Sequence, residues 1–120
     1  MIPTYEKQTD ELTEKELKIV PFIVSKLSLN IGKKKSVTNG LICKALKSTG
    51  INITQPRFRK IIQYIRLNGL IPCLVATSKG YYVAETKQDC LEHIEMYDKR
   101  INSETLGRDA LAYQMKQKFN

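Results

Sequence analysis

The sequence predicts a mainly helical α+β protein, in which three short helices and a β-hairpin are followed by a long C-terminal helix. Two observations carry this prediction. Apolar residues recur at the three- and four-residue spacing of an amphipathic helix in several separate stretches. Two short β-rich runs flank the tetrapeptide Thr77-Ser78-Lys79-Gly80, which is typical of a hairpin. A length of 120 residues suits one small domain with an extension.

The first helix is predicted over residues 14–29. Thr13 and Glu16 have the spacing of a capping box, in which each side chain accepts a hydrogen bond from the other residue's backbone N–H. Pro21 removes a backbone donor in the middle of this stretch, which predicts a kink or a later start. Residues 1–8 contain no periodic pattern and are predicted to be a flexible N-terminal tail. The apolar stripe of the helix consists of Leu12, Leu17, Val20, Val24 and Leu27, and it is widened by Ile19 and Ile23.

The second helix is predicted over residues 39–48, with Thr38 as its N-cap and Gly50 just past its end. The side chains that it is expected to bury are Leu41, Ile42, Ala45 and Leu46. The preceding residues 30–37 form a basic connector with three consecutive lysines, Lys33, Lys34 and Lys35. A solvated loop is the usual outcome for such a run, and contact with phosphates is the alternative.

The third helix is predicted over residues 55–67 and has the clearest start in the chain. Thr54 can cap it, and Pro56 lies in its first turn, where a missing N–H costs nothing. Asn68-Gly69 ends it. Its predicted buried stripe, at positions i, i+3, i+4 and i+7, is Phe58, Ile61, Ile62 and Ile65.

The hairpin is predicted from residues 70–77 and 81–84. Pro72 confines the first strand to a sheet edge or to its own opening residues. Tyr81 and Tyr82 are adjacent in the second strand, so their side chains point to opposite faces. One of the two is expected to pack on the core, and the other is expected to be able to approach a ligand.

Residues 87–120 are predicted to form a helical extension, with Thr86 and Asp89 resembling a capped start. An apolar seam at three- and four-residue spacing lapses around Glu104 and Gly107 and then resumes. The seam consists of Leu91, Ile94, Tyr97, Ile101, Leu111, Met115 and Phe119. Such a helix either folds back on its own domain or pairs with a partner helix, and a homodimer is the favoured prediction.

Charge is distributed unevenly along this chain, whose net charge is +8. Residues 17–84 contain twelve Lys or Arg and no Asp or Glu, whereas the segments before and after have net charges of −3 and −1. A positive block of this length predicts a face that binds a polyanion such as nucleic acid. The alternative is a basic surface that serves only solubility.

The stretch RKIIQYIRLNGLIPCLVATSKGYYVA, followed by a charged helix, resembles winged helix-turn-helix DNA-binding domains, and more narrowly the small winged-helix proteins of bacteriophages and mobile elements. The resemblance covers about residues 10–86, and residues 9–86 are assigned to this domain. It implies that residues 55–67 are the recognition helix and that residues 74–84 are the wing. It also implies binding of double-stranded DNA, as a regulator of transcription or replication in a phage or mobile element.

In this interpretation the third helix enters the major groove, which is wide enough for a helix. Its basic side chains neutralise phosphates or reach guanine edges, and Gln63 can pair with adenine. Backbone N–H groups near Thr54 and Gln55 suit a phosphate, and Lys79 at the wing tip contacts phosphate or the adjacent minor groove. The predicted DNA-binding residues are Thr54, Gln55, Arg57, Arg59, Lys60, Gln63, Tyr64, Lys79, Lys33, Lys34 and Lys35.

The sequence does not predict an enzyme, a cofactor or a small-molecule ligand. Cys90 and His93 share one helical face, but Cys43 and Cys73 are isolated, so zinc is not predicted and these two cysteines are expected in the core. Without an export signal or a membrane-length apolar run, the protein is expected in the cytoplasm. If a phage encodes it, this is the cytoplasm of the bacterial host. The alternative function is a protein-docking module, in a phage particle or replisome, that uses the C-terminal helix.

Overall fold

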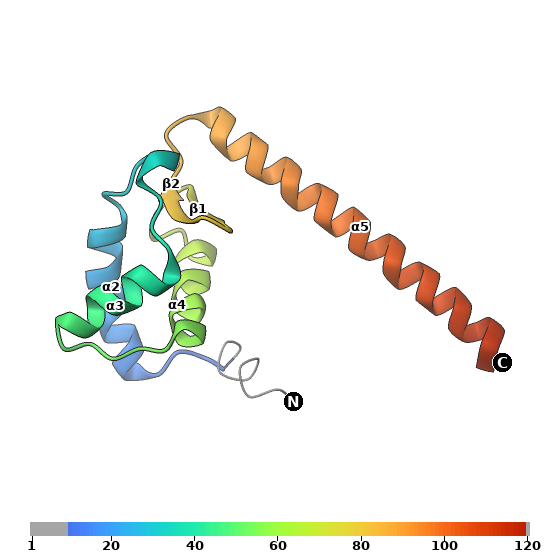
Figure 1. Cartoon of the computed structure of the whole chain (residues 1–120), viewed down its shortest axis with the longest axis horizontal. Helices are drawn as coiled ribbons and strands as arrows, with labels where there is room; N and C mark the ends of the chain where they lie inside the picture. The colour runs from blue at the N-terminus through green and yellow to red at the C-terminus, as the bar shows by residue number, and fades with distance from the viewer. Residues whose placement is uncertain (1–9, 120) are drawn as a thin grey trace. The chain divides into compact units, whose positions relative to one another are not determined.

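The computed structural model describes residues 10–119, so the tail predicted over residues 1–8 lies outside the described residues. The chain divides into two compact units, Met1–Glu85 and Thr86–Asn120. The described part of the first unit contains three α-helices, a short 3₁₀ turn and an antiparallel pair of strands, whereas the second is one long helix (Figure 1). The predicted class, mainly helical with a hairpin and a long C-terminal helix, is confirmed.

The first helix, α2, runs from Glu14 to Leu27. The capping box is formed as predicted, since the Thr13 N–H donates to Glu16 Oε1 at 2.9 Å and the Glu16 N–H donates to Thr13 Oγ1 at 3.2 Å. Pro21 is exposed, and the helix runs through it without a late start. Val20, Ile23 and Leu27 are the side chains that α2 buries in the core.

The second helix, α3, runs from Asn39 to Ser48, with Thr38 Oγ1 accepting from the Leu41 N–H at 3.2 Å. Its buried face differs from the predicted one. Leu41 is 62% exposed and Ala45 is exposed as well. The side chains that pack on the core are Ile42, Cys43 and Leu46. Ile42 and Leu46 therefore face the core as predicted, whereas Leu41 and Ala45 do not and Cys43 does, so the buried face is rotated by less than one residue, or 100°, from the predicted face.

The third helix, α4, runs from Gln55 to Leu67, with Pro56 in its first turn, and ends at Asn68 and a left-handed Gly69. Its predicted stripe is confirmed, because all four side chains are at most 2% exposed: Phe58, Ile61, Ile62 and Ile65. This helix is the centre of the first unit, since residues of α2, α3 and the hairpin belong to the same core cluster. Burial of four large side chains on one face fixes which face of α4 is left for solvent.

The hairpin consists of β1, Leu74–Thr77, and β2, Gly80–Val83, paired so that Thr77 lies opposite Gly80. β1 begins later than predicted because Cys73 adopts a left-handed φ of 61° just after Pro72. Cys73 is exposed, so its predicted place in the core is wrong.

Tyr81 and Tyr82 occupy opposite faces of β2. Tyr81 belongs to the core cluster of the first unit, as one of the two was predicted to do. Tyr82 is only 3% exposed, so the prediction that the second tyrosine approaches a ligand is wrong. Neither ring therefore contributes to the exposed surface of the hairpin.

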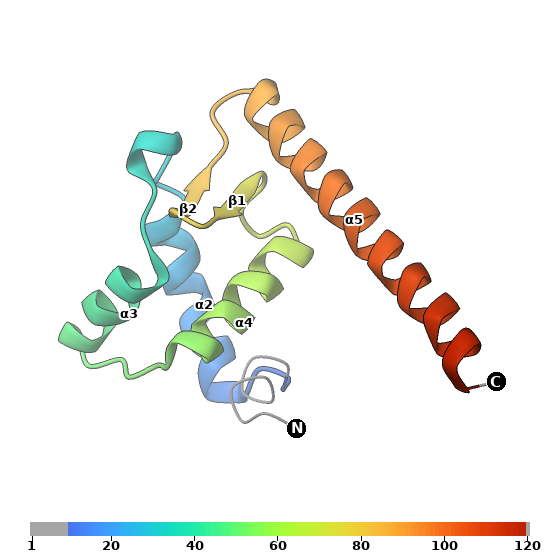
Figure 2. The same cartoon turned by 45° about the vertical axis from the view of Figure 1, so that its right-hand side comes forward.

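The basic connector between α2 and α3 is not an isolated loop, because its backbone pairs with β2 of the hairpin (Figure 2). Ile31 and Val37 form isolated bridges with Val83 and Tyr81 of β2. Between these bridges, residues Lys33–Lys35 form the 3₁₀ turn η1. Gly80 packs closely here, because a Cβ at this position would lie 2.3 Å from the carbonyl oxygen of Val37.

The second unit is the helix α5, Lys87–Phe119, which spans 33 residues without interruption. Its start is capped as predicted, since the Asp89 N–H donates to Thr86 Oγ1 and the Thr86 N–H donates to Asp89 Oδ2. None of its residues is buried. Among the described helices, none combines the length and the apolar character that crossing a membrane requires.

Candidate functional site

The exposed face of α4 carries polar side chains at four-residue spacing. Gln55, Arg59 and Gln63 are all exposed and follow one another at about one turn of the helix. The half-buried Lys60 lies beside this row and donates from Nζ to Gln63 Oε1 at 3.3 Å. The structure therefore places these four predicted residues together on one surface.

A polar pocket of about 350 Å³ lies where the first turns of α3 and α4 meet the hairpin turn. Its lining residues are Thr38, Asn39, Gly40, Gln55, Arg59, Thr77, Ser78, Gly80 and Tyr81. Three segments that are distant in the sequence thus converge on one hollow. Arg59 supplies the positive charge of the pocket.

Hydrogen bonds from Asn39 and Tyr81 hold the walls of the polar pocket together. The Tyr81 hydroxyl donates to Asn39 Oδ1 at 2.8 Å, and Asn39 Nδ2 donates to the Gln55 carbonyl at 3.2 Å. Burial raises the pKa of Tyr81, with the nearby Arg59 charge opposing the rise. The hydroxyl therefore keeps its proton at neutral pH and remains a donor. These contacts fix the hairpin relative to the first turns of both helices.

Lys79 lies in the two-residue turn between the strands, where it is exposed. Its backbone N–H donates to Thr77 Oγ1 at 3.1 Å. This bond orders the turn, and the Lys79 side chain is exposed. The residues on either side of Lys79, Ser78 and Gly80, line the polar pocket, whereas Lys79 is not one of its lining residues.

Arg57 requires a correction, because its side chain binds within the protein. Its guanidinium donates to both Glu16 carboxylate oxygens, at 2.8 and 2.6 Å, and to the carbonyl oxygens of Asp10 and Glu11. The two charged side chains are only 15% and 14% exposed. Arg57 thus joins α4 to the start of α2 and is not placed to contact DNA.

Glu16 shows the strength of this attachment. The hydrogen bonds from Arg57 lower the pKa of Glu16 from 4.5 to about 2, against a smaller opposing effect of burial. Arg57 has its own pKa raised by the same hydrogen bonds. Both members of the pair are therefore charged at neutral pH, and the Glu16 carboxylate neutralises the charge of Arg57, one of the basic residues in the positive block.

The remaining predicted site residues do not line the polar pocket. Lys33, Lys34 and Lys35 are exposed on η1, next to Gly32, whose N–H bonds to Val83 at the end of β2 away from the turn. Tyr64 is half-buried and packs against the core, and its predicted contact with DNA stays a prediction. Thr54 is exposed at the N-cap position, but its side chain makes no capping hydrogen bond.

Two residues of this site, Asn39 and Tyr81, were missed by the sequence-based prediction. Asn39 follows an N-cap, so it has the appearance of an ordinary first-turn residue. The hydrogen bond that gives it a role spans 42 residues of sequence. Periodicity and capping rules cover contacts within about one helical turn, so no local signal could have found this pair.

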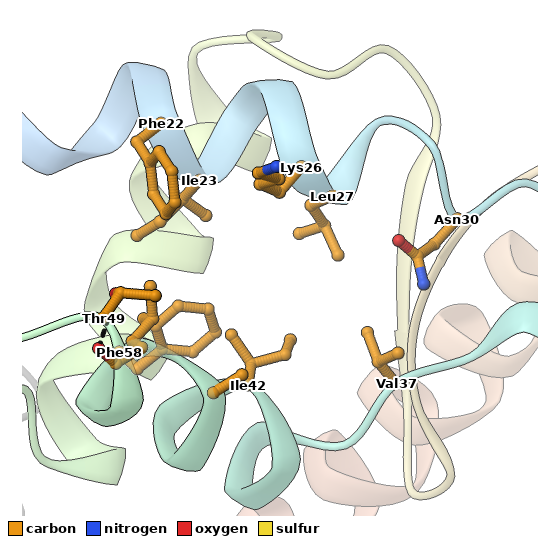
Figure 3. A pocket seen from close by; sticks show the side chains of 11 residues that line it. Phe22, Ile23, Lys26, Leu27, Asn30, Val37, Ile42, Thr49 and Phe58 are labelled. Atoms are coloured by element: carbon orange, nitrogen blue, oxygen red, sulfur yellow. Dashed lines mark hydrogen bonds between the residues drawn. The ribbon is translucent and has the colours of Figure 1, made fainter. Parts of the chain in front are cut away.

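A second pocket, with mostly apolar walls, lies between α2 and α3 and has a volume of about 280 Å³ (Figure 3). Phe22, Ile23 and Leu27 extend into it from α2, and Ile42 faces them from α3. Lys26 lies at this surface, with its Nζ 5.8 Å from the centroid of the Phe22 ring. This pocket was not anticipated from the sequence.

Over residues 10–119, no group of three His, Cys, Asp or Glu side chains could hold a metal ion. Cys43 is half-buried and packs on the core as predicted, and burial raises the pKa of its thiol.

Comparison of the chain with protein-family models, with curated protein sequences and with solved structures finds no match.

Proposed function

We propose that the first unit binds double-stranded DNA as a winged helix-turn-helix domain. The order of its elements supports this: α2, a connector that pairs with the hairpin, then α3, α4 and the hairpin. In such a domain α3 and α4 are the helix-turn-helix, α4 is the recognition helix and the hairpin is the wing. The polar pocket carries the proposal, because it joins the exposed face of α4 to the hairpin turn within the segment that lacks carboxylates.

The exposed row on α4 provides the proposed base contacts. Gln63 can bind the N6 and N7 groups of adenine with two parallel hydrogen bonds, and Arg59, one turn before it, lies at the end of the row that reaches the polar pocket. Lys60 is held against Gln63 and provides charge at the flank of the row. Binding of α4 in the major groove would bring this row to the base edges.

The polar pocket and the hairpin tip provide the proposed phosphate contacts. A phosphate at the pocket would meet Arg59 and Gln55 on one side and Ser78 on the other. Lys79 would contact the next phosphate or the adjacent minor groove. Phosphate contacts of this kind fix the register of a protein on the duplex but carry no sequence information themselves.

The resemblance to winged-helix proteins of phages and mobile elements extends this proposal to a role. We infer a non-enzymatic regulator of transcription or replication that acts in the cytoplasm of a bacterial host. The alternative is a docking module that uses α5, and it is favoured by the large apolar side chains that α5 exposes. A docking module would not need a 68-residue segment, residues 17–84, without one carboxylate, so DNA binding is preferred.

The proposal is tested by the salt dependence of duplex binding. The double variant Arg59→Gln/Lys79→Gln removes one charge from α4 and one from the hairpin turn. If each charge meets a phosphate, the slope of log Kd against log salt falls by about 1.8 in the variant. Fluorescence anisotropy with a random-sequence 20-base-pair duplex at several salt concentrations measures this slope.

The matched control is Lys99→Gln/Lys116→Gln, which removes two exposed charges from α5 and is expected to leave the slope unchanged. An unchanged slope in Arg59→Gln/Lys79→Gln, or no duplex binding at about 50 mM salt, would refute the proposed interface.

A further inference from the structure

Several of the exposed apolar residues of α5 lie along one seam, among them Ile94, Ile101, Leu111 and Met115. Positions spaced alternately by three and four residues lie on one face of a helix and form the contact line of a coiled coil. In α5 these positions are held by Ile94, Tyr97, Ile101, Glu104, Arg108, Leu111, Met115 and Lys118. The apolar members of the inner part are open to solvent, with Ile101 59% and Leu111 68% exposed. The seam thus has an acid and a base at its centre and apolar residues on each side.

We propose that two copies of the chain pair through this seam with their α5 helices antiparallel, so that Glu104 of each copy faces Arg108 of the other. In an antiparallel coiled coil the layers pair an a position with a d position. A register that sets Glu104 against Arg108 has a two-fold axis between them, so the same ion pair forms twice. This register then determines every other layer.

The layers beside the central ion pairs are apolar in this register. Ile101 of each copy faces Leu111 of the other, which buries two branched side chains that the single chain exposes. The next layer outward sets Met115 opposite Tyr97. The paired stretch, residues 94–118, is about 37 Å long at 1.5 Å per residue. Glu104 and Arg108 interrupt the apolar seam of one helix, but in the dimer they face each other and the apolar residues on either side face apolar residues.

The parallel arrangement is disfavoured by the same two residues. In an in-register parallel pair each seam position meets its own copy, so Glu104 would face Glu104 and Arg108 would face Arg108. Like charges in facing layers are destabilising. Polar residues in a coiled-coil seam commonly fix register and orientation at some cost in stability, which is the role that the geometry assigns to this pair.

Positions that flank the seam do not oppose the antiparallel register. Near the two-fold axis, Thr105 would approach Thr105 of the second copy, and Gly107 would approach Gly107. Gly107 has no neighbouring atom within 4 Å of an added Cβ, so a second helix can come close there. Arg108 is at present paired with Asp109 at 2.8 Å, but these side chains are 76% and 59% exposed. An exposed pair of this kind is weak and can exchange for a partner in the second copy.

A charge-swap cycle tests the orientation in the full chain. Glu104→Arg places two arginine pairs in the centre of the antiparallel dimer, so its dissociation constant should rise at least about ten-fold, since like charges in the seam are destabilising. The double variant Glu104→Arg/Arg108→Glu restores opposite charges and should bind within about three-fold of the original chain. Glu95→Arg makes the same change off the seam and serves as the control. Sedimentation equilibrium measures the dissociation constants, and circular dichroism checks that helix content is kept.

Two outcomes overturn the inference. A chain that stays monomeric up to several hundred micromolar does not self-pair through α5. A dimer that is equally stable in the original chain and in Glu104→Arg is not antiparallel in this register. In a parallel pair the substitution only replaces a Glu–Glu layer by an Arg–Arg layer, so little change in stability is expected. The inference does not depend on DNA binding, since the salt-slope measurement on Arg59 and Lys79 reports on the first unit alone.

Discussion

Replacing Arg57 by glutamine tests which basic residues of α4 stabilise the fold and which are available to bind a ligand. Arg57 and Arg59 are two residues apart on the same helix, and both were candidates for DNA contact. The structure gives Arg57 four hydrogen bonds, two of them to the Glu16 carboxylate, whereas Arg59 is exposed at the polar pocket. Arg57→Gln should therefore lower stability and leave the salt slope of DNA binding unchanged.

The size of the loss follows from the Glu16 carboxyl, whose pKa is about 2 in the folded protein and ordinarily 4.5. A shift of this size is worth at most about 3.4 kcal/mol at 1.36 kcal/mol per pKa unit. The pair keeps some exposure, and solvent screens it, so about 2 kcal/mol is expected. Because the folded pKa is the lower one, this stabilisation is complete above pH 4.5 and is lost as the pH falls from 4.5 towards 2.

Urea unfolding followed by circular dichroism, at pH 7 and at several values down to pH 2.5, measures this difference. Arg57→Gln should unfold about 2 kcal/mol more easily than the original chain at pH 7, and the gap should narrow below pH 4.5. Arg59→Gln is the matched control and should change stability by less than about 0.5 kcal/mol. Equal stability of Arg57→Gln and the original chain at pH 7, or a gap that does not depend on pH, would refute the reasoning.

Two further substitutions test the backbone of the first unit by thermal unfolding. Gly80→Ala should destabilise by about 2 kcal/mol or more, because its Cβ would meet the Val37 carbonyl at a φ of 122°. Gly107→Ala in α5 has open space and should be neutral or stabilising, and a similar effect of the two would contradict the close packing of Gly80. Cys73→Gly should stabilise by about 0.5 to 1 kcal/mol, since Cys73 has a φ of 61°, and a loss of stability would show that its side chain contributes contacts.

The candidate site was predictable in part. The buried stripe of α4 could be derived from spacing alone, and it defines an opposite face on which Arg59, Lys60 and Gln63 lie. The same reasoning could not separate Arg57 from Arg59, because both are basic residues on a helix with a known buried side. Their difference depends on Glu16, which is 41 residues away along the chain.

The sequence by itself determined the features that arise within about one helical turn. The capping box of Thr13 and Glu16, the end of α4 at Gly69 and the turn of the hairpin each depend on neighbours three or four residues apart. Local hydrogen bonds and periodic apolar burial are encoded in such short windows.

Only the tertiary structure decided what those elements meet. The connector pairs with β2, the polar pocket unites α3, α4 and the hairpin turn, and Arg57 joins α4 to α2. Each of these contacts depends on how apolar faces stack, and a rotation of less than one residue, as in α3, changes which side chains face a partner. Stacking is set by the shapes of all the faces together, and no short window of the sequence contains that information.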